Sequence, residues 1–363
     1  MKFAVGYQLA EAGEESFVDI VGDYREHVAE VYFPWADLPS GRGALLSRRG
    51  YTDWTGQRRL EADLVALREM GVKLDLLLNA NCYGRHAVSR FLENQVVSVL
   101  EHLDGLVGGA DVVTTASPAV ARTVQKRFGS IDVRASVNLR IGTVRAMEYV
   151  AGLFDSFHVQ RERNRDLAAL RELLAWAGAR GKRLHLLVNS GCLPDCPGQV
   201  FHDNMVAHEA EIDETDNIPG WTPHVCWHFF RDRRNWPALL GATWVRPEDL
   251  HHYEGLFETV KLATRMHARP RAVIDAYVRR RWRGNLLDLM EPAFSPALAP
   301  HILDNEAFPD DFFQRTATCD RRCDRCDYCR DVLQRVLVRA DGAAPAPLDR
   351  QDHGQTRSPA GRE

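Results

Sequence analysis

Short apolar runs rich in β-branched residues alternate along the first 265 residues with longer stretches whose apolar residues recur about every 3.6 positions. The short runs predict buried strands, and the longer stretches predict amphipathic helices between them. Eight strands are predicted, at residues 2–7, 28–33, 73–79, 111–116, 132–138, 155–160, 183–189 and 258–263. This alternation is typical of a parallel sheet whose strands are joined by helices.

Two helical stretches show the helical period most clearly. The segment QRRLEADLVALREM (57–70) ends before Gly71, and RNRDLAALRELLAWAGA (163–179) ends shortly before Gly181. Glycine is the usual residue just past the end of a helix. Eight alternating units favour a closed barrel over an open doubly wound sheet, because no Gly-x-Gly-x-x-Gly loop follows the first strand. We therefore predict an α/β fold, a (β/α)8 TIM-like barrel over residues 1–265.

Two segments depart from this rhythm. Residues 190–241, between the seventh and eighth strands, form an insertion with three cysteines and four histidines. A connection of that length is more often functional than idle. Residues 266–339 are predicted to form a helical, cysteine-rich extension, in which YVRRRW and DVLQRVLVRA are the expected helical pieces. Residues 340–363 are rich in Ala, Pro, Gly and charge, which predicts a disordered tail.

Composition narrows the class of protein. A chain of 363 residues with 45% hydrophobic residues can bury a sizeable core. It has no apolar run of about 20 residues, and its start, MKFAVGYQLA, lacks the pattern of an export signal. We therefore expect a cytoplasmic protein with no membrane insertion. The net charge of −4 and the lack of a basic, aromatic stripe give no sign of a nucleic-acid surface, although RNA stays open as a substrate.

Four of the eight cysteines lie within eleven residues and are separated by three, two and two residues: Cys319, Cys323, Cys326 and Cys329. Because a cytoplasmic chain of this size does not need disulfides, this density indicates metal binding. Several two-residue gaps in one run favour a 4Fe-4S cluster, and zinc is the alternative. The first three cysteines also match the motif of radical S-adenosylmethionine enzymes. Their place beyond the barrel, and the fourth cysteine, argue against that use.

The insertion carries a second candidate metal site. Cys192 and Cys196 lie in NSGCLPDCPGQVFHDN, where prolines disfavour a regular helix and glycines allow tight folding around a ligand. Cys226 lies in the same insertion, and Cys82 follows the third strand, so four thiolates are predicted to meet at one mouth of the barrel. The alternatives to Cys82 are an iron left open for substrate, or one of three histidines as the fourth ligand: His202, His224 or His228. One or two 4Fe-4S clusters are therefore expected.

Amide and guanidinium groups are frequent at the predicted strand ends, which face the substrate in barrels of this type. Such groups bind carboxylates and carbonyls, and arginine does so with two parallel hydrogen bonds. Gln160 and Arg161 follow the sixth strand, and the residues predicted to bind a small-molecule substrate are Asn79, Asn138, Arg140, Asn189, Arg246 and Arg265. Proton transfer is assigned to three residues: His202, Asp203 and Lys261. The alternatives are helix capping by the asparagines and a loop-stabilising pair of His202 with Asp203.

Near the eighth strand, the segments WVRPEDL (244–250) and VKLATRM (260–266) precede a helix that ends in AYVRRRW. This motif resembles the collagenase-like peptidase family U32. Five residues match the family's Asp-Leu turn and its Lys-Ile-Glu-Gly-Arg-Met strand end: Asp249, Leu250, Lys261, Arg265 and Met266. Ala263 and Thr264 stand where Glu and Gly are usual, and NSGC replaces the family's His-Gly-Ala-x-Cys. These departures indicate a divergent branch.

The resemblance implies an iron–sulfur barrel protein. Many such proteins resemble oxygen-independent hydroxylases of tRNA, ribosomal RNA or ubiquinone, with prephenate implied as the oxygen donor in some branches. It also implies a related barrel subunit or an electron donor as partner. We therefore predict an iron–sulfur oxidoreductase, a hydroxylase or related redox enzyme. The alternatives are a metal-dependent peptidase, although the sequence has no His-Glu-x-x-His and no Gly-x-Ser-x-Gly, and a non-catalytic iron–sulfur partner subunit.

Overall fold

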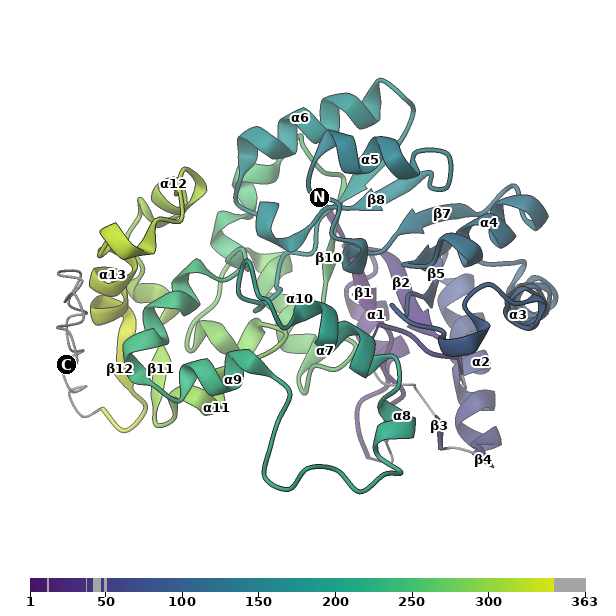
Figure 1. Ribbon diagram of the computed structural model, residues 1–363, viewed down its shortest axis with the longest axis horizontal. Helices are drawn as coiled ribbons and strands as arrows, with labels where there is room; N and C mark the ends of the chain where they lie inside the picture. The colour runs from purple at the N-terminus through teal and green to yellow at the C-terminus, as the bar shows by residue number, and fades with distance from the viewer. Residues whose placement is uncertain (12, 37, 42–46, 49–50, 343–363) are drawn as a thin grey trace, which may run out of the picture.

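Eight parallel strands form the central sheet of the molecule (Figure 1). The computed structural model describes residues 1–342 except 12, 37, 42–46 and 49–50. In chain order the strands are β1 (Lys2–Gly6), β2 (Val28–Pro34), β5 (Lys73–Leu78), β6 (Val112–Thr115), β7 (Asp132–Ala135), β8 (Ser156–His158), β9 (Arg183–His185) and β10 (Thr259–Leu262). Their order in the sheet is β10-β1-β2-β5-β6-β7-β8-β9. All eight predicted strands are therefore confirmed.

The sheet closes on itself between β9 and β10. Beyond β9 the chain continues beside β10, where Lys261 N donates to Leu186 O at 2.7 Å and Val188 N donates to Lys261 O at 3.1 Å. Leu187 forms a parallel bridge with Lys261. Because the two ends of the strand order meet here, the sheet is a barrel, and the predicted (β/α)8 TIM-like fold is confirmed.

Helices pack on the outer face of the barrel between successive strands (Figure 1). They are α1 (Phe17–Asp23), α2 (Trp54–Glu69), α3 (Arg90–Val107), α4 (Pro118–Arg127), α5 (Val144–Val150) and α6 (Leu167–Gly178). The predicted helix at 57–70 is α2, and the one at 163–179 is α6. Helix α6 begins at Leu167 because Asp166 caps it, accepting a hydrogen bond from Ala169 N at 3.0 Å. A short hairpin, β3 (Ser47–Arg48) with β4 (Tyr51–Thr52), precedes α2.

The apolar core lies between the sheet and the helices. Helix α3 shows why the sequence folds this way, because five of its apolar residues recur at helical spacing and are all buried: Leu92, Val96, Leu100, Leu103 and Val107. Its first turn is capped by Ser89, whose hydroxyl accepts from Leu92 N at 3.2 Å. The helix ends at Gly108, which has a φ of 71°.

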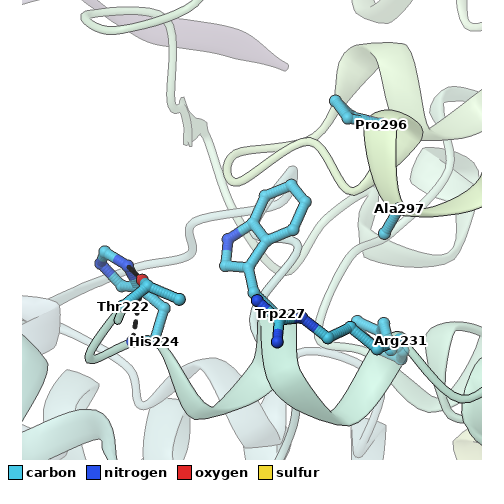
Figure 2. Close-up of a pocket in the computed structure, with 7 residues that line it drawn as sticks. Thr222, His224, Trp227, Arg231, Pro296 and Ala297 are labelled. Carbon is cyan, nitrogen blue, oxygen red and sulfur yellow. Dashed lines mark hydrogen bonds between the residues drawn. The ribbon is translucent and has the colours of Figure 1, made fainter. Parts of the chain in front are cut away.

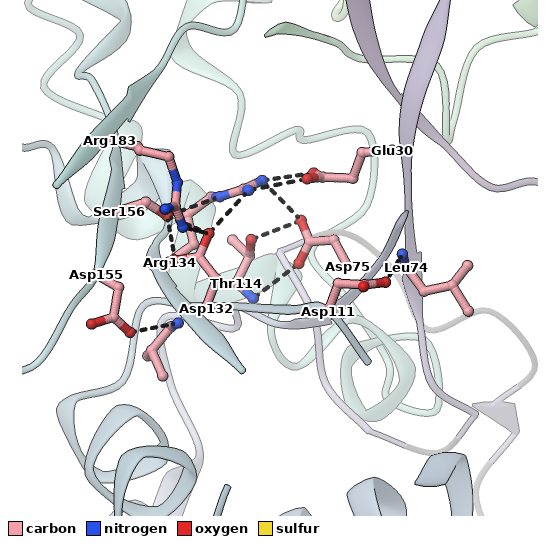
Figure 3. A network of polar contacts seen from close by, with 11 residues as sticks. Glu30, Leu74, Asp75, Asp111, Thr114, Asp132, Arg134, Asp155, Ser156 and Arg183 are labelled. Carbon is pink, nitrogen blue, oxygen red and sulfur yellow. Dashed lines mark hydrogen bonds and ion pairs between the residues drawn. The ribbon is translucent and has the colours of Figure 1, made fainter. Parts of the chain in front are cut away.

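The interior of the barrel is charged instead of being filled with aliphatic layers. Arg134 of β7 forms two hydrogen bonds with the carboxylate of Glu30 on β2, at 2.6 and 3.0 Å, and lies 3.7 Å from Asp75 on β5 (Figure 3). A small apolar group, Ala4, Tyr32 and Leu77, is separate from the main core. The lumen therefore holds paired charges next to the residues that reach the barrel mouth.

The insertion between β9 and β10 is helical. It contains α7 (Gln199–Val206), α8 (Glu209–Ile212), α9 (Val225–Phe230) and the 3-10 helix η4 (Arg233–Gly241). A further 3-10 helix, η5 (Pro247–Tyr253), leads into β10. In Figure 1, α9 lies toward the C-terminal extension, and α8 lies at the foot of the view on the side of α2.

The extension after the barrel contains helices and a two-stranded antiparallel sheet. Its helices are α10 (Pro270–Arg279), α11 (Ser295–Leu298), α12 (Phe312–Ala317) and α13 (Tyr328–Val336), and its strands are β11 (His301–Leu303) and β12 (Leu337–Arg339). Two predictions need correction here. The expected helix DVLQRVLVRA stops at Val336, because the next residues pair with β11, and YVRRRW stops at Arg279, because Arg280 adopts a φ of 54°.

Residues 343–363, most of the predicted tail, lie outside the described residues. No helix in the part of the chain that the structure describes is long and apolar enough to cross a membrane. The predicted domain boundaries at 265 and 339 stay predictions.

Candidate active site and metal centres

A pocket of about 70 Å³ lies at the barrel mouth, where the carboxyl ends of the strands meet. Six polar side chains from separate parts of the chain line it: Tyr32, Asn79, Asn138, Arg161, Lys261 and Arg265. Glu291, from the extension, lines it as well. Its size suits the reactive end of a small substrate.

Lys261 places an ammonium group at the base of this pocket. Its Nζ lies 3.6 Å from the ring centroid of Tyr32, within the range of a cation–π contact. Burial lowers the pKa of Lys261, while the carboxylates of Asp75 and Glu30 raise it and offset only part of that effect. A lysine with a lowered pKa can accept a proton near neutral pH.

Two asparagine amides and two guanidinium groups form the walls. Asn79 Oδ1 accepts from Gly41 N at 2.8 Å, and Asn138 Oδ1 accepts from an Arg161 Nη at 3.0 Å. Gly41 has no room for a side chain, since a Cβ there would lie 2.7 Å from the Asn79 amide and 3.0 Å from that of Asn138. Arg265 donates to Ser40 Oγ at 2.9 Å. The walls can therefore donate several hydrogen bonds to a carboxylate.

Sequence reasoning missed two lining residues, Tyr32 and Glu291. Tyr32 lies inside β2, where a tyrosine reads as an ordinary strand residue, and its hydroxyl donates to Leu262 O at 2.7 Å. Glu291 reaches the mouth because Ser190 and Glu291 form a parallel bridge and Gly191 N donates to Glu291 O at 2.9 Å. Only the glycine in NSGC could have signalled this contact, since a Cβ at Gly191 would lie 2.2 Å from Pro292 O.

Three residues predicted to bind substrate do not line the mouth pocket. The side chain of Asn189 is fully buried and binds backbone groups, donating to Ala263 O and Leu289 O and accepting from Ala263 N. Arg246 forms two 2.9 Å hydrogen bonds with Asp249. Arg140 lies 3.3 Å from Glu162. The structure therefore gives Asn189 and Arg246 structural contacts and pairs Arg140 with Glu162.

His202 and Asp203 lie on α7 in the insertion, away from Lys261 in the sequence, and they are not among the residues lining the mouth pocket. The ring of His202 packs edge-on against that of His224, with centroids 4.5 Å apart. This contact places His202 against His224, which precedes Cys226 by two residues.

Three thiols of the insertion, those of Cys192, Cys196 and Cys226, form what we call the inner cysteine set. Burial raises the pKa of Cys226 to about 11, and the thiols of Cys192 and Cys196 raise it further. Burial also raises the pKa of Cys196, and the thiol of Cys192 adds to this effect. The thiol of Cys192 therefore acts on both of the others, and that of Cys196 acts on Cys226.

The backbone at Gly198, two residues after Cys196, lies close to a side chain of α9. A Cβ at Gly198 would lie only 2.7 Å from Cγ2 of Val225, the residue before Cys226. Any side chain at position 198 would push the loop that carries Cys196 away from α9. Gly198, one of the glycines predicted to allow tight folding, is therefore at a position where the chain packs closely.

Cys82 and two of the histidines considered as a fourth ligand make contacts within their own segments. Cys82 Sγ accepts a hydrogen bond from Gly84 N at 3.4 Å, within its own turn. His224 Nδ1 lies 2.9 Å from Thr222 Oγ1, and His228 Nε2 lies 2.8 Å from Thr222 O. His224 also lines a second pocket, of about 430 Å³, with Trp227 of α9, Arg231 just after that helix, and residues of α11 (Figure 2). The fourth ligand of the inner set stays a prediction.

The cysteines near the C-terminus, which we call the outer cysteine run, are Cys319, Cys323, Cys326 and Cys329. The first three are exposed and the fourth is half-buried. Burial raises the pKa of Cys329 to about 11, and the other three thiols raise it further, while Arg165 lowers it. The other three thiols therefore lie within electrostatic range of Cys329.

The donor chemistry of both sets fits a thiolate-bound metal centre, since sulfur ligands at this density suit iron–sulfur clusters or zinc. Among the described residues, no three His, Cys, Asp or Glu side chains are already arranged to hold a single metal ion. Binding of a single zinc ion would therefore have to draw the thiols of each set closer together.

No known protein-family model matches the sequence. The chain is 24% identical over 318 residues to an uncharacterized protease of Methanocaldococcus jannaschii, a match that covers 85% of this chain and 88% of the relative. The solved structure of a U32 peptidase superposes with a TM-score of 0.51 at 17% identity, covering 72% of this chain and 92% of that chain. At that identity the structural likeness shows the fold alone. The predicted resemblance to the U32 peptidases is confirmed.

Proposed function

We propose that this divergent relative of the U32 peptidases is an enzyme that binds a carboxylate-bearing small molecule at the barrel mouth, beside an iron–sulfur cluster held by the inner cysteine set. The proposal rests on the observation that the mouth pocket and the loop of the inner cysteine set meet at one contact. Glu291 lines the mouth, and its backbone is hydrogen-bonded to Gly191, the residue before Cys192. The loop of the inner cysteine set and the mouth pocket thus share the contact between Gly191 and Glu291.

The mouth supports an anionic ligand. Arg161 and Arg265 supply guanidinium groups, and Asn79 and Asn138 supply amides that face the same pocket. Arginine and amide N–H groups match the geometry of a carboxylate. Lys261, whose pKa burial lowers, is placed to take or return a proton at the bound molecule.

The inner set supports a cluster through its thiols and its surroundings. Cys192, Cys196 and Cys226 would hold the iron, with Cys82 or a neighbouring histidine as the fourth ligand. When bound, such a cluster supplies electron transfer or a Lewis-acidic iron next to the substrate. The specific reaction that we propose is an oxygen-independent hydroxylation or a related redox reaction. This part of the proposal rests on the family resemblance.

A metal-dependent peptidase is the second candidate, and the names of both relatives favour it over the hydroxylase, since one is called a protease and the other a peptidase. The same mouth could bind the terminal carboxylate of a short peptide. The two candidates differ in the metal they require and in the product that they release.

The test begins with protein purified without oxygen. We expect broad absorption near 400 nm and about four irons per cluster. Cys192→Ser and Cys226→Ser should each lose the iron that the inner cysteine set binds. Gly198→Ala should lower that iron content through its clash with Val225, and the double variant Gly198→Ala/Val225→Ala should restore it. Gly241→Ala is the matched control, because a Cβ at Gly241 meets nothing within 4 Å.

Iron-free protein that cleaves unstructured peptides, with fragments seen by mass spectrometry, would overturn the iron–sulfur proposal and support the peptidase. An iron-loaded protein that leaves such peptides intact would exclude the peptidase. In either case, Lys261→Met tests the role of the mouth, since both candidates need its proton transfer.

A further inference from the structure

The outer cysteine run lies directly against the loop of the inner set. Arg321, between Cys319 and Cys323, has an Nη 3.4 Å from the carboxylate of Asp195, the residue before Cys196. A second Nη of Arg321 donates to the backbone oxygen of Glu162. A residue inside one cysteine run therefore binds a residue inside the other.

The backbone at this contact is unusual on both sides. Arg321 has a φ of 60° and Asp195 a φ of 54°. Residues other than glycine rarely adopt positive φ, and such residues persist only where the surrounding structure holds them. They concentrate at functional sites. An exposed ion pair alone would be weak evidence, but here both partners adopt an uncommon conformation within their own cysteine segments.

A second connection runs through Arg165. Its guanidinium lies 5.6 Å from the ring centroid of Phe312 on α12, the helix that leads into the outer run. It donates to Leu240 O and Ala242 O, and the residue after Ala242, Thr243, donates from its backbone N to Cys192 O at 3.0 Å. Arg165 thus contacts the helix before the outer run on one side and the backbone next to Thr243, which binds Cys192, on the other.

Arg165 also has an unused donor. It is 8% exposed, its guanidinium lies 4.8 Å from the ring centroid of Trp244, and its Nη1 has no hydrogen-bond partner among the described residues. A buried donor of this kind is costly unless an acceptor takes its proton. The anionic sulfur of a cluster bound by Cys329 would be such an acceptor, and N–H groups near sulfur are known to tune cluster potentials.

We propose that the outer cysteine run binds a second iron–sulfur cluster, and that this cluster passes single electrons from a soluble one-electron carrier protein to the inner cluster. The proposal rests on the proposed function for the inner set. In each transfer the carrier loses one electron and the inner centre gains one, and no bond forms or breaks. The exposure of Cys319, Cys323 and Cys326 leaves the outer centre open to a carrier.

The experiment uses full-length protein purified without oxygen. Wild type should hold about eight irons, with each of Cys192→Ser and Cys326→Ser losing about half. After reduction with dithionite, the electron paramagnetic resonance signal of wild type should be broadened by interaction between two nearby centres. Each single variant should give one simple signal. With reduced ferredoxin as the carrier, reduction of the inner centre should be at least about tenfold slower in Cys326→Ser.

Arg165→Met should shift the reduction potential of the outer centre to more negative values, because removing a positive charge disfavours the added electron. Arg180→Met is the matched control, since Arg180 lies over Trp176 instead, 4.4 Å from its ring centroid. This potential shift is a readout that a merely structural arginine would not produce.

Three outcomes would overturn the proposal. One is about four irons and one zinc, with iron unchanged in Cys326→Ser. Another is two clusters whose signals are the plain sum of the two variants. The third is unchanged electron uptake in Cys326→Ser. Failure of the proposed function looks different, because Cys192→Ser would then keep its full iron content.

Discussion

His158 stands on β8 inside the barrel, where its side chain is 1% exposed and its ring centroid lies 5.5 Å from that of His185. Burial holds the pKa of His158 well below its ordinary value, and the charges of Lys261, Arg134 and Arg161 lower it further. The folded protein therefore keeps this ring neutral. As the pH falls below about 6.5, the unfolded chain takes up a proton that the folded protein does not, so the free energy of unfolding decreases.

His158→Asn should make this loss shallower between about pH 6.5 and 4.5, by up to about 1.4 kcal/mol per pH unit. The measurement is the free energy of unfolding from urea titrations at several pH values. His27→Asn, at an exposed position, is the control and should leave the slope unchanged. Equal slopes in wild type and His158→Asn would mean that the ring takes up a proton in the folded state as well.

At the residue scale the sequence predicts the chemical type of a polar side chain better than it predicts which groups that side chain binds. Asn79 and Asn138 follow buried strands, and both line the mouth. Asn189 has the same position after its strand, yet its amide binds three backbone groups. Nothing local separates the two cases, because the difference lies in segments about 75 and 100 residues away in the chain.

At the scale of elements, β7 contributes the charge that holds the lumen together. Arg134 binds Glu30 of β2 and lies within 4 Å of Asp75 of β5 and Asp132 of its own strand, at 3.7 and 3.4 Å. Burial raises the pKa of Asp75, and Glu30 raises it further, while Arg134 lowers it. Removing the cation would leave buried carboxylates without compensation.

Arg134→Met should therefore lower the free energy of unfolding by about 3–5 kcal/mol, as measured in urea near neutral pH. Arg183→Met is the matched control, because Arg183 binds the same Asp132 at 2.9 Å with a side chain that is 60% exposed. Its loss should cost less than about 1 kcal/mol. Similar losses in the two variants would show that water reaches the lumen and screens these charges.

The elements that the sequence predicts well are those with a strong local signal. The eight strands are short apolar runs, and α2 and α6 carry a clear helical period with capping residues. The stretch after Val336 also fits a helix locally, but its three residues pair with β11 instead. Tertiary pairing overrides local preference there, as it often does at the ends of elements.

At the scale of the whole molecule, barrel and extension share one apolar core. A single buried cluster includes Phe3 of β1 and Leu337 of β12. Trp244 stacks on Phe312 of α12 with ring centroids 5.7 Å apart, and the Tyr277 hydroxyl of α10 donates to Val245 O at 2.7 Å. Because these contacts bury both parts at once, neither part is expected to keep its structure when the other is lost.

Metal-free protein should therefore unfold in urea as one cooperative unit. Hydrogen exchange followed by mass spectrometry should give one midpoint for peptides from β1 and from α13. A lower midpoint for α13 would contradict this expectation and would make the extension an independent domain. That lower midpoint would also indicate a domain boundary between barrel and extension, which the sequence analysis predicts near residue 265.

The junction of β9 with β10 gives Lys261 two duties. Its backbone N and O fasten the two ends of the sheet to each other, and its side chain reaches the mouth pocket. Parting of the strands at this seam would carry the amine, with β10, away from mouth residues on the other side of the seam, such as Arg161 after β8. Conversely, a ligand that binds the amine also favours the closed barrel. Ligand binding at the mouth and the stability of the β9–β10 junction are therefore thermodynamically linked. The slowing of deuterium uptake at one backbone amide, that of Lys261, would then report directly that the mouth is filled.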